Sequence, residues 1–562
     1  MKKSVHLIAC TIAFLGFYSC KNKAPDPELV TIDLLRGDVL LCGPGNFGEV
    51  SFSESCSIKT QENFDLGIAL LHSFEYEEAE KAFVKVIDED PDCVMAYWGV
   101  AMSNFHSLWL QSGTGYLEKG SKIVEIAQKL PKTEREHDYL DAIGVFYKDW
   151  KTIDRKTRIS LFEQKMEALY QKYDDDKEAA IFYALALCSA ADPTDKTYTN
   201  QLRAGKILES LLKDNPNHPG IAHYIIHNYD YPELAKLALP VARRYAKIAP
   251  ASAHAQHMPS HIFTRLGLWN ESINSNLNST SAAVCYAEST HPKAHWDEEL
   301  HGMDYLVYAY LQTGDHAKAN EQNEYLKTFK EVFPANFKIA YSVAAIPARI
   351  ALEDKDWKKA ADLQLPSLDI DWKDFPWERS VFHFARALGS ARSEDISAAE
   401  KELDSLKIAH QELLYLKDDY KARQVLIQIN AIAAWILYAE GSHNKAIAQM
   451  TETADMEDST AKHPVTPGEI VPARELLGDL LLACNKPVEA LEAYEADLAM
   501  RPNRFNGLYG AAITAKLAGK PDKAEHYFTK LLEIAKSSNS DRPEIKEAIA
   551  YLEKEITTVK QD

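Results

Sequence analysis

The sequence predicts an all-α protein. Apolar residues recur with helical spacing along most of the 562 residues, and Gly (23) and Pro (24), which interrupt helices, are few. Hydrophobic residues make up 46% of the chain, which is enough to bury a core, but the length exceeds that of one compact globule. We therefore expect several helical units or one extended array of repeats.

The charge balance argues against one broad class of partner. The chain has 63 Lys and Arg against 83 Asp and Glu, which gives a formal net charge of −20 at pH 7. A field of this sign repels the phosphates of nucleic acids and of anionic lipids. We therefore expect no nucleic-acid partner.

Residues 1–19 have the pattern of an export signal. Lys2 and Lys3 precede an apolar run, residues 7–18, that is too short to span a bilayer. The run ends in "FYSC", which resembles the lipobox of bacterial lipoproteins, although Phe17 stands where that motif usually has an aliphatic residue. The resemblance implies lipidation of Cys20, and an ordinary secretory signal is the alternative. We expect an exported protein held at a membrane by lipid alone, on the periplasmic or surface face of an outer membrane.

Residues 20–58 are predicted to form a polar tether and an N-terminal loop segment. Export implies an oxidising compartment, and Cys42 and Cys56 flank the Gly-rich stretch "CGPGNFGEVSFSESC". A disulfide between Cys42 and Cys56 is therefore a candidate. Four later cysteines sit in helical apolar patterns and are predicted to be small core residues, namely Cys93, Cys188, Cys285 and Cys484.

Small and aromatic residues repeat with a period of 34 towards the C-terminus. The aligned pairs are Gly478 with Ala512, Ala490 with Ala524, and Tyr494 with Phe528. This period and these residue types resemble the tetratricopeptide repeat (TPR), a hairpin of two helices. The resemblance implies a TPR-type helical-hairpin superhelix, or α-solenoid, in which small side chains let the paired helices approach closely.

The same register divides the rest of the chain. The predicted parts are N-terminal repeats at 59–127, central helical repeats with a His-rich groove at 128–350, an irregular helical segment at 351–430, C-terminal repeats at 431–540, and a terminal helix and tail at 541–562. Loop insertions rich in Gly, Pro, Thr and Asp break the count at 111–120, 191–201 and 462–473. We expect such loops to cover the superhelix.

Histidines are concentrated in the central repeats. Ten of the 19 lie between His218 and His316. Helical spacing places His223, His227 and Asp230 of "HYIIHNYD" on one face, and the three histidines of "HAQHMPSH" on one face of the next hairpin. Neighbouring first helices lie about 8–10 Å apart. The side chains could therefore converge on a zinc or other transition-metal ion. The candidate ligands are His223, His227, Asp230, His254, His257 and His261.

The TPR resemblance gives these positions a second interpretation. It implies that first-helix residues line a concave groove in which partners are held. His301 and Asp304 take equivalent places in the following hairpin, and His72 and His106, which are 34 residues apart, do so in the N-terminal repeats. These four residues are the candidate groove-binding set.

Three interpretations of the histidines remain open. They are hydrogen-bonded members of helix contacts, or they line a groove for a protein or a glycan stacked on Trp98, Trp109, Trp269 or Trp296, or they bind a metal. "HYIIH" has the spacing of a zinc protease motif, but Tyr224 stands where the general-base Glu belongs.

The sequence shows no G-x-S-x-G, no P-loop and no dinucleotide-binding glycine pattern. The primary prediction is therefore a non-enzymatic TPR-like lipoprotein of the bacterial cell envelope that binds a protein partner or ligand. One alternative is a glycan-capture or accessory lipoprotein of a polysaccharide-utilisation system. The other is a metal-binding protein or metallohydrolase that uses His223, His227, His257 and His261.

Overall fold

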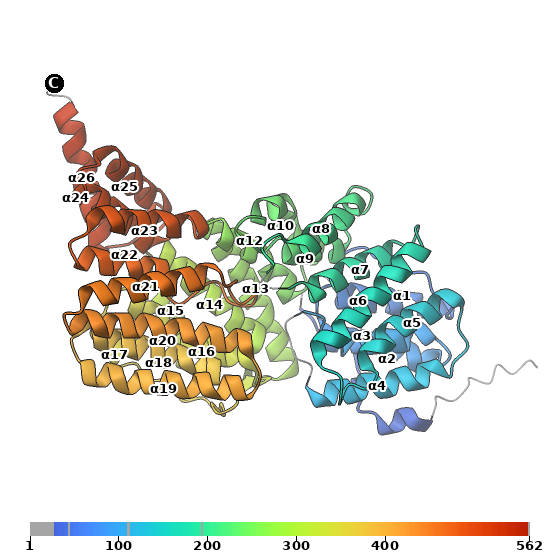
Figure 1. Cartoon of the computed structure of the whole chain (residues 1–562). Coiled ribbons are helices and arrows are strands. Elements are labelled where there is room, and N and C mark those ends of the chain that lie inside the picture. The colour runs from blue at the N-terminus through green and yellow to red at the C-terminus, as the bar shows by residue number, and fades with distance from the viewer. Residues whose placement is uncertain (1–26, 43–44, 109–112, 193–194, 560–562) are drawn as a thin grey trace, which may run out of the picture.

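The computed structural model describes residues 27–42, 45–108, 113–192 and 195–559, with side chains as far as residue 554. Consecutive helices pack side by side, from α1–α7 at one end of the molecule to α22–α26 at the other (Figure 1). The predicted all-α fold of TPR-type helical hairpins is confirmed. The predicted signal peptide and Cys20 lie outside the described residues.

The N-terminal half begins with two short 3₁₀ helices, η1 (Pro27–Thr31) and η2 (Ile58–Thr60). The α-helices that follow are α1 (Gln61–His72), α2 (Tyr76–Glu89), α3 (Val94–Ser103), α4 (Thr114–Gln128), α5 (Glu134–Tyr147), α6 (Arg155–Lys172), α7 (Lys177–Ala190), α8 (Thr199–Leu212), α9 (Pro219–Asn228), α10 (Ala235–Ile248), α11 (Ala253–His257), α12 (Pro259–Arg265) and α13 (Trp269–Thr290).

Two three-residue strands, β1 (Ala294–Trp296) and β2 (Glu331–Phe333), pair in parallel between the helices of the second half. The helices there are α14 (Asp297–Gln312), α15 (His316–Leu326), α16 (Phe337–Glu353), α17 (Trp357–Ala361), α18 (Pro376–Arg392), α19 (Ile396–Tyr415), α20 (Asp419–Ala439), α21 (His443–Asp458), α22 (Ala473–Ala483), α23 (Pro487–Met500), α24 (Phe505–Leu517), α25 (Pro521–Ala535) and α26 (Pro543–Val559).

The repeat signature has a direct packing explanation. Gly478 of α22 and Gly510 of α24 both lie against the ring of Tyr494 on α23, and a Cβ added at Gly510 would meet that ring at 2.4 Å. In the N-terminal repeats, Gly67 and Gly99 flank the ring of Phe83 in the same way. Each aromatic ring therefore fills the space that two glycines leave between neighbouring hairpins.

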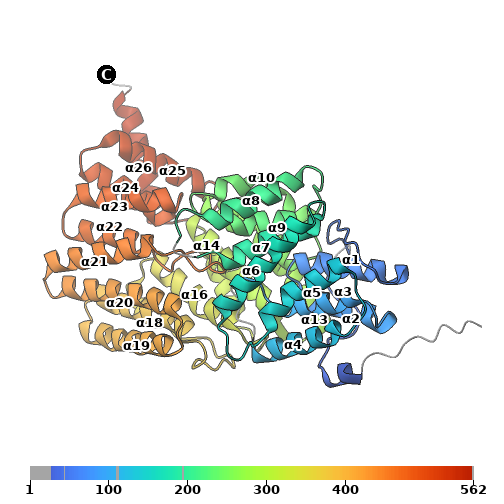
Figure 2. The ribbon, with the colours of Figure 1, turned by 45° about the vertical axis from the view of Figure 1, so that its right-hand side comes forward.

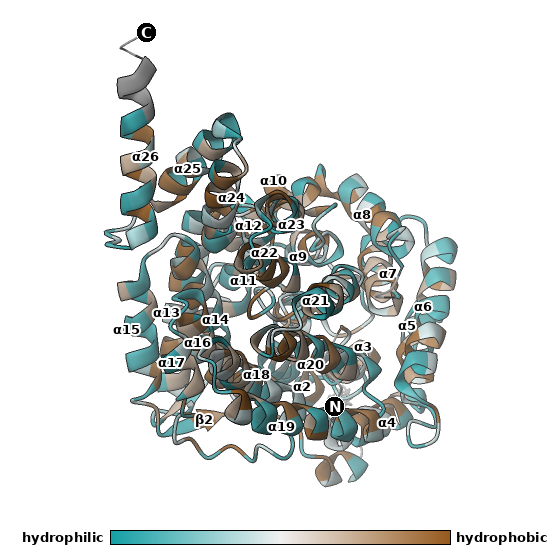
Figure 3. Ribbon diagram, turned by 60° about the vertical axis from the view of Figure 1, so that its left-hand side comes forward, coloured by the Kyte–Doolittle hydropathy of each residue, from teal (hydrophilic) through white to brown (hydrophobic). Residues whose placement is uncertain are grey.

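Apolar residues lie mainly where helices face one another, whereas outer helices such as α15 are largely hydrophilic (Figure 3). Among the described residues, α20 is one helix whose length and apolar composition would suffice to cross a membrane. It packs against α18, α19 and α21, and its buried Trp435 and Ile432 belong to the core. We therefore interpret α20 as a core helix.

The C-terminal repeats fold back onto the middle of the chain. The indole N–H of Trp269 donates to the carbonyl oxygen of Asn503 at 2.7 Å, across 234 residues. The amide nitrogen of Asn503 donates to the carbonyl oxygen of Gly267 at 3.2 Å. In two views the α22–α26 stack continues directly above α18–α21, and these contacts fix where it meets the central helices (Figures 1 and 2).

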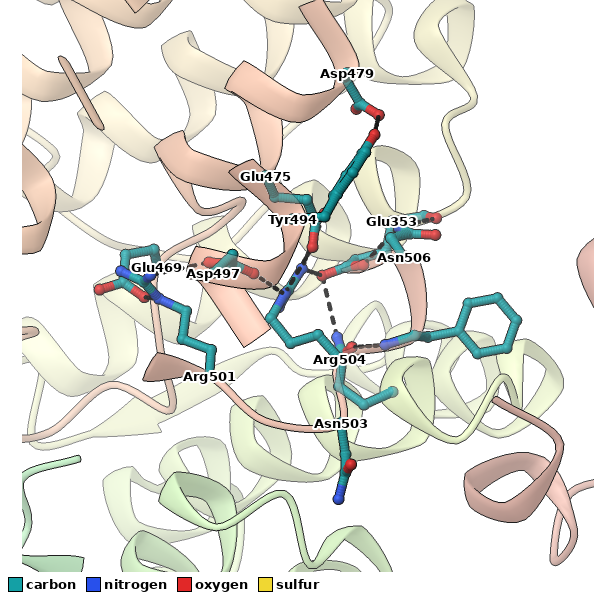
Figure 4. Close-up of polar contacts among 12 residues, drawn as sticks. Glu353, Glu469, Glu475, Asp479, Tyr494, Asp497, Arg501, Asn503, Arg504 and Asn506 are labelled. Atoms are coloured by element: carbon teal, nitrogen blue, oxygen red, sulfur yellow. Dashed lines mark hydrogen bonds and ion pairs between the residues drawn. The ribbon is translucent and has the colours of Figure 1, made fainter. Parts of the chain in front are cut away.

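A buried charge network reinforces this closure. The guanidinium of Arg504 donates to Glu353 at 2.7 Å and to Glu475 at 3.0 Å (Figure 4). It also donates to the hydroxyl of Tyr308 at 2.9 Å. Both carboxylates and the guanidinium are buried. Three separate repeats are therefore tied to one side chain, and the loss of Arg504 would leave two buried carboxylates without their shared cation.

The disulfides differ from the candidate pair. Cys42 bonds to Cys285 on α13, with a Cα–Cα distance of 5.9 Å, and Cys56 bonds to Cys93 before α3, at 4.8 Å. The predicted bond between Cys42 and Cys56 is therefore wrong, and Cys93 and Cys285 are not simply core residues. The reason is that the N-terminal segment runs across the repeats, so each of its cysteines meets a different helix. Cys188 and Cys484 are free.

We expect Gly510→Ala to lower the free energy of unfolding by about 1–3 kcal/mol, because the added methyl group overpacks the Tyr494 site. The ring has little room to move, since its hydroxyl donates to Asp479 at 2.6 Å. Urea denaturation followed by circular dichroism measures the change. The control is Gly115→Ala in the first turn of α4, where a new Cβ meets nothing within 4 Å. Equal stability of the two variants would contradict the packing explanation.

Candidate metal centre

Four short segments bring the candidate histidines together. Helix α9 carries His223 and His227, α11 carries His254 and His257, α12 carries His261, and α14 carries His301. The side chain of His218 and Pro219 at the first turn start α9, and Ser252 caps α11 by accepting from the backbone N–H of Ala255. Because α12 contacts α9 and α11 contacts α14, the inner faces of these helices meet.

The six imidazoles form two groups rather than one. In the first group, one ring nitrogen each of His223, His227 and His254 lies within 4.8 Å of the others. The second group has the same property and consists of His257, His261 and His301. The structure therefore separates the four histidines expected around one ion into two pairs. It adds His301, which was predicted for the groove, to the second pair.

Five of the six histidines are at most 6% exposed, and the side chain of His254 is 13% exposed. Burial is the largest effect on the pKa values of His223, His227, His257 and His301 and holds them well below the usual range, and like charges on neighbouring imidazoles act in the same direction. These four imidazoles are therefore held in the neutral form, which is the form that binds metals.

The outer nitrogens of the second group are fixed by hydrogen bonds. Nδ1 of His261 lies 3.1 Å from Oδ2 of Asp230, and Nδ1 of His257 lies 2.6 Å from Oδ1 of Asn276. The orientation of the Asn276 amide is itself fixed, because its Nδ2 donates to the carbonyl oxygen of Ser272 at 2.8 Å. Both Nδ1 atoms therefore face acceptors and must carry the hydrogen.

The inner nitrogens of this group then face each other without a hydrogen. Nε2 of His257 lies 3.0 Å from Nε2 of His261, and in the tautomers set by Asp230 and Asn276 each presents a lone pair. Two lone pairs at this distance repel unless a cation lies between or beside them. Burial opposes protonation by lowering the pKa of His261, although Asp230 raises it in part. The donor set therefore fits a metal ion better than a proton.

In the first group, the tautomer of His223 is fixed in a similar way. Nδ1 of His223 lies 2.6 Å from the carbonyl oxygen of His72, which can only accept, so Nδ1 is the donor. Nε2 of His223 thus presents its lone pair to Nε2 of His227 at 2.9 Å. Nδ1 of His254 lies 3.5 Å from Oε2 of Glu298, and its buried Nε2 has no hydrogen-bond partner among the described residues.

Asp230 orients the second group through its contact with Nδ1 of His261. Its carboxylate binds His261, accepts from Arg265 at 2.8 Å, and accepts from Lys462 at 3.3 Å. Burial raises the pKa of Asp230, but Lys462 and Arg265 outweigh this, so the pKa lies well below its usual range. Asp230 was predicted as a direct ligand, but it belongs to neither group and orients His261 instead.

The insertion at 462–473 covers this part of the solenoid. The carbonyl oxygen of Thr466 accepts from the hydroxyl of Tyr305 at 3.2 Å, and Arg349 donates to the carbonyl oxygens of Gly468 and Glu469. Burial lowers the pKa of Lys462 to about 8, against the opposite effect of Asp230. The loop thereby brings a buried cation to the site from 232 residues away.

Of the candidate groove residues, His72, His301 and Asp304 are buried. His72 lies between Glu178 at 2.9 Å and the hydroxyl of Tyr224 at 3.0 Å, and Asp304 accepts from Arg349 at 2.9 Å. His106 is half-buried and packs against the rings of Tyr76 and Tyr116. None of these side chains offers an open surface to a protein partner.

The tryptophans considered as glycan platforms are also packed. Trp98 and Trp269 are buried, and Trp296 lies against the ring of Tyr286. Trp109 lies outside the described residues. Sequence reasoning did not identify the residues that orient the cluster, which are Arg265, Asn276, Glu298 and Lys462.

No protein-family model matches the chain, and no curated protein matches it. Three solved structures are similar over most of both chains. They are Cut9–Hcn1 of the APC/C (11% identity, 87% of this chain and 90% of that chain, TM-score 0.30), yeast Tom70 (12%, 90% and 96%, 0.34) and the TPR domain of P58(IPK) (13%, 90% and 100%, 0.19). All three TM-scores are below 0.5, and the TPR-type fold follows from the packing of the paired helices.

We expect Glu178→Gln to lower the free energy of unfolding by about 1–3 kcal/mol at neutral pH. The carboxylate accepts from both His72 and His218, each at 2.9 Å, whereas a glutamine has one acceptor oxygen. Burial raises the pKa of Glu178, but His218 and His72 lower it by more, so the net shift is downward.

Because the pKa of Glu178 is lowered in the folded state, its contribution is fully present above the ordinary carboxyl pKa and is lost as the pH falls. The difference between wild type and Glu178→Gln should therefore be largest near pH 7 and shrink below about pH 4. Urea denaturation at several pH values measures this. The exposed Glu134→Gln serves as control, and a difference independent of pH would contradict the assignment.

Proposed function

We propose that this chain is an exported metal-binding protein that holds a transition-metal ion at His257, His261 and His301. The observation that carries the proposal is the 3.0 Å approach of two Nε2 lone pairs, with both Nδ1 atoms committed to acceptors. The ring of His301 lies beside them, 4.2 Å from that of His257 between centroids. Three neutral imidazoles from α11, α12 and α14 thus surround one point.

The donor set indicates the kind of metal. Imidazole suits zinc, copper, iron and nickel, whereas magnesium and calcium require oxygen ligands. Two nitrogens bound to one tetrahedral zinc lie about 3.3 Å apart, because Zn–N bonds are about 2.0–2.1 Å long. The observed 3.0 Å is within a few tenths of this value. The carboxylate of Asp230 behind His261 is the outer partner that metal-ligating histidines commonly have.

The disulfides support the exported location. Cys42–Cys285 and Cys56–Cys93 require an oxidising environment, which agrees with the export signal predicted at residues 1–19. With the lipobox-like sequence before Cys20, this supports a lipoprotein of the bacterial cell envelope. Both bonds tie the N-terminal segment to the repeats, so a lipid at Cys20 would hold a folded body near the membrane.

A TPR-type solenoid also suggests a protein-interaction scaffold, which was the primary prediction from the sequence. A protein partner would bind a surface other than the histidine cluster, because these side chains are buried and covered by residues 462–473. Trp98 and Trp269 are packed in the interior, so their rings are not accessible for stacking on a glycan. The geometry therefore favours the metal over the partner or the glycan as the ligand of the histidines.

We expect the mature protein, after gentle purification or loading with Zn²⁺ or Cu⁺, to retain a bound ion through desalting and to gain thermal stability. The double variant His257→Gln/His261→Gln should lose one equivalent and most of the stabilisation. Elemental analysis and thermal denaturation measure the two effects. The exposed His443→Gln on α21 is the control. A wild-type protein with neither bound ion nor thermal shift would rule out the proposal.

We expect non-reducing peptide mapping of protein exported by a bacterial host to recover the linked peptides Cys42–Cys285 and Cys56–Cys93. Reduction should release both pairs, and Cys484 should be alkylated without reduction once the chain is unfolded. The Cys285→Ser variant should leave Cys42 reactive while preserving the other pair. A linked Cys42–Cys56 peptide in the wild type would contradict the structure.

A further inference from the structure

We propose that His223, His227 and His254 form a second metal site next to the first, so that the protein holds a pair of transition-metal ions. This inference rests on the proposed function, because it assigns a neighbour to the ion bound by His257, His261 and His301. It concerns three different side chains, and the number of bound ions tests it separately.

The tautomer of His223 is fixed by a hydrogen bond. Its Nδ1 donates to the carbonyl oxygen of His72 at 2.6 Å, so its Nε2 carries the lone pair that a metal would bind. Metal-binding histidines commonly donate their second ring N–H to a backbone carbonyl oxygen, which orients the ring, and His223 has this hydrogen bond. Nε2 of His227 approaches the same point at 2.9 Å.

One ring nitrogen of His254 is unsatisfied. Its Nε2 is buried and has no hydrogen-bond partner in the part of the chain that the structure describes. On the other side of the ring, Nδ1 faces Glu298 at 3.5 Å, and Glu298 binds Lys338 at 2.6 Å. A buried polar atom without a partner costs about 1–3 kcal/mol. A metal ion bound by the three imidazoles would remove this cost.

Another histidine group in the structure has all of its ring nitrogens hydrogen-bonded. His72, Glu178 and His218 also bring ligand atoms within 4.8 Å of one another. There, each imidazole donates to its own carboxylate oxygen at 2.9 Å, and Nδ1 of His72 meets the hydroxyl of Tyr224. That group is satisfied by hydrogen bonds without an ion. The group around His254 is not.

The two proposed sites are immediate neighbours. The ring centroids of His227 and His261 are 6.2 Å apart, and those of His254 and His257 are 6.4 Å apart. Two members of the first group thus lie directly against two members of the second. Ions bound in both groups would be close enough to influence each other electrostatically and, if paramagnetic, magnetically.

The charges around the pair bear on the choice of metal. The nearby carboxylates Asp230 and Glu298 are already paired with Lys462, Arg265 and Lys338, and imidazole ligands bring no negative charge to a bound ion. The cost of burying an ion rises with the square of its charge, so two Cu⁺ ions are less costly there than two Zn²⁺ ions. The shared chemistry is that of imidazole-seeking metals, and we expect the second site to favour Cu⁺.

The test is the stoichiometry of the full mature protein with the metals alone as probes. Samples titrated with Zn²⁺ or, anaerobically, with Cu⁺ are desalted and analysed for metal per chain. The wild type should hold two Cu⁺, and His254→Gln and His301→Gln should each hold one. The double variant His254→Gln/His301→Gln should hold none, and the exposed His443→Gln should match the wild type. Circular dichroism verifies folding, and His227→Gln replaces His254→Gln if the latter does not fold.

The outcomes separate the two proposals. One ion in the wild type that His254→Gln retains and His301→Gln loses would overturn the second site and leave the first intact. Two ions that His254→Gln and His227→Gln both retain would also overturn the second site. No ion in any sample would remove both. In protein loaded with Cu²⁺, a spin-coupled or broadened electron paramagnetic resonance signal that becomes a simple isolated signal in His254→Gln would support the pair.

Discussion

The buried carboxylate of Asp230 is the interaction on which the candidate centre depends. It receives His261 and Arg265 from α12 and Lys462 from a loop that follows α21. A single ionised carboxylate in the interior would be strongly unfavourable, and three donors offset its desolvation. The same contacts fix the tautomer of His261 and hold the covering loop. Orientation of the imidazole and closure of the site therefore come from one residue.

The repeat architecture explains why so many imidazoles meet. Each hairpin places its first helix beside that of the next, so histidines four residues apart on successive helices form adjacent pairs. The separation into two groups follows from the outer partners, because His72 and Asn276 turn the His223 and His257 rings in fixed directions. The repeats thus place the histidines close together, and residues outside the repeat pattern determine which histidines form each group.

Closure of the solenoid is a second condition for the site. Arg504 connects Glu353 and Glu475, and Asn503 connects to Trp269, so the C-terminal repeats are docked against the central helices. This docking positions the residues 462–473 that cover α12 and α14. Burial lowers the effective dielectric constant around the centre, which strengthens the electrostatic interactions inside it. Burial also favours the proposed ion over a large partner as the ligand of the histidines.

The sequence by itself determined the helical class, the TPR-type period and the concentration of histidines on a few helices, because helical periodicity and the Gly–aromatic packing are local properties. It also indicated an oxidising location. Only the tertiary structure decided the disulfide partners, the division of the imidazoles into two groups and the roles of Asp230, Asn276, Glu298 and Lys462. The physical reason is that these features depend on contacts between residues that are as many as 243 positions apart, and no local spacing encodes the path of a loop across a solenoid.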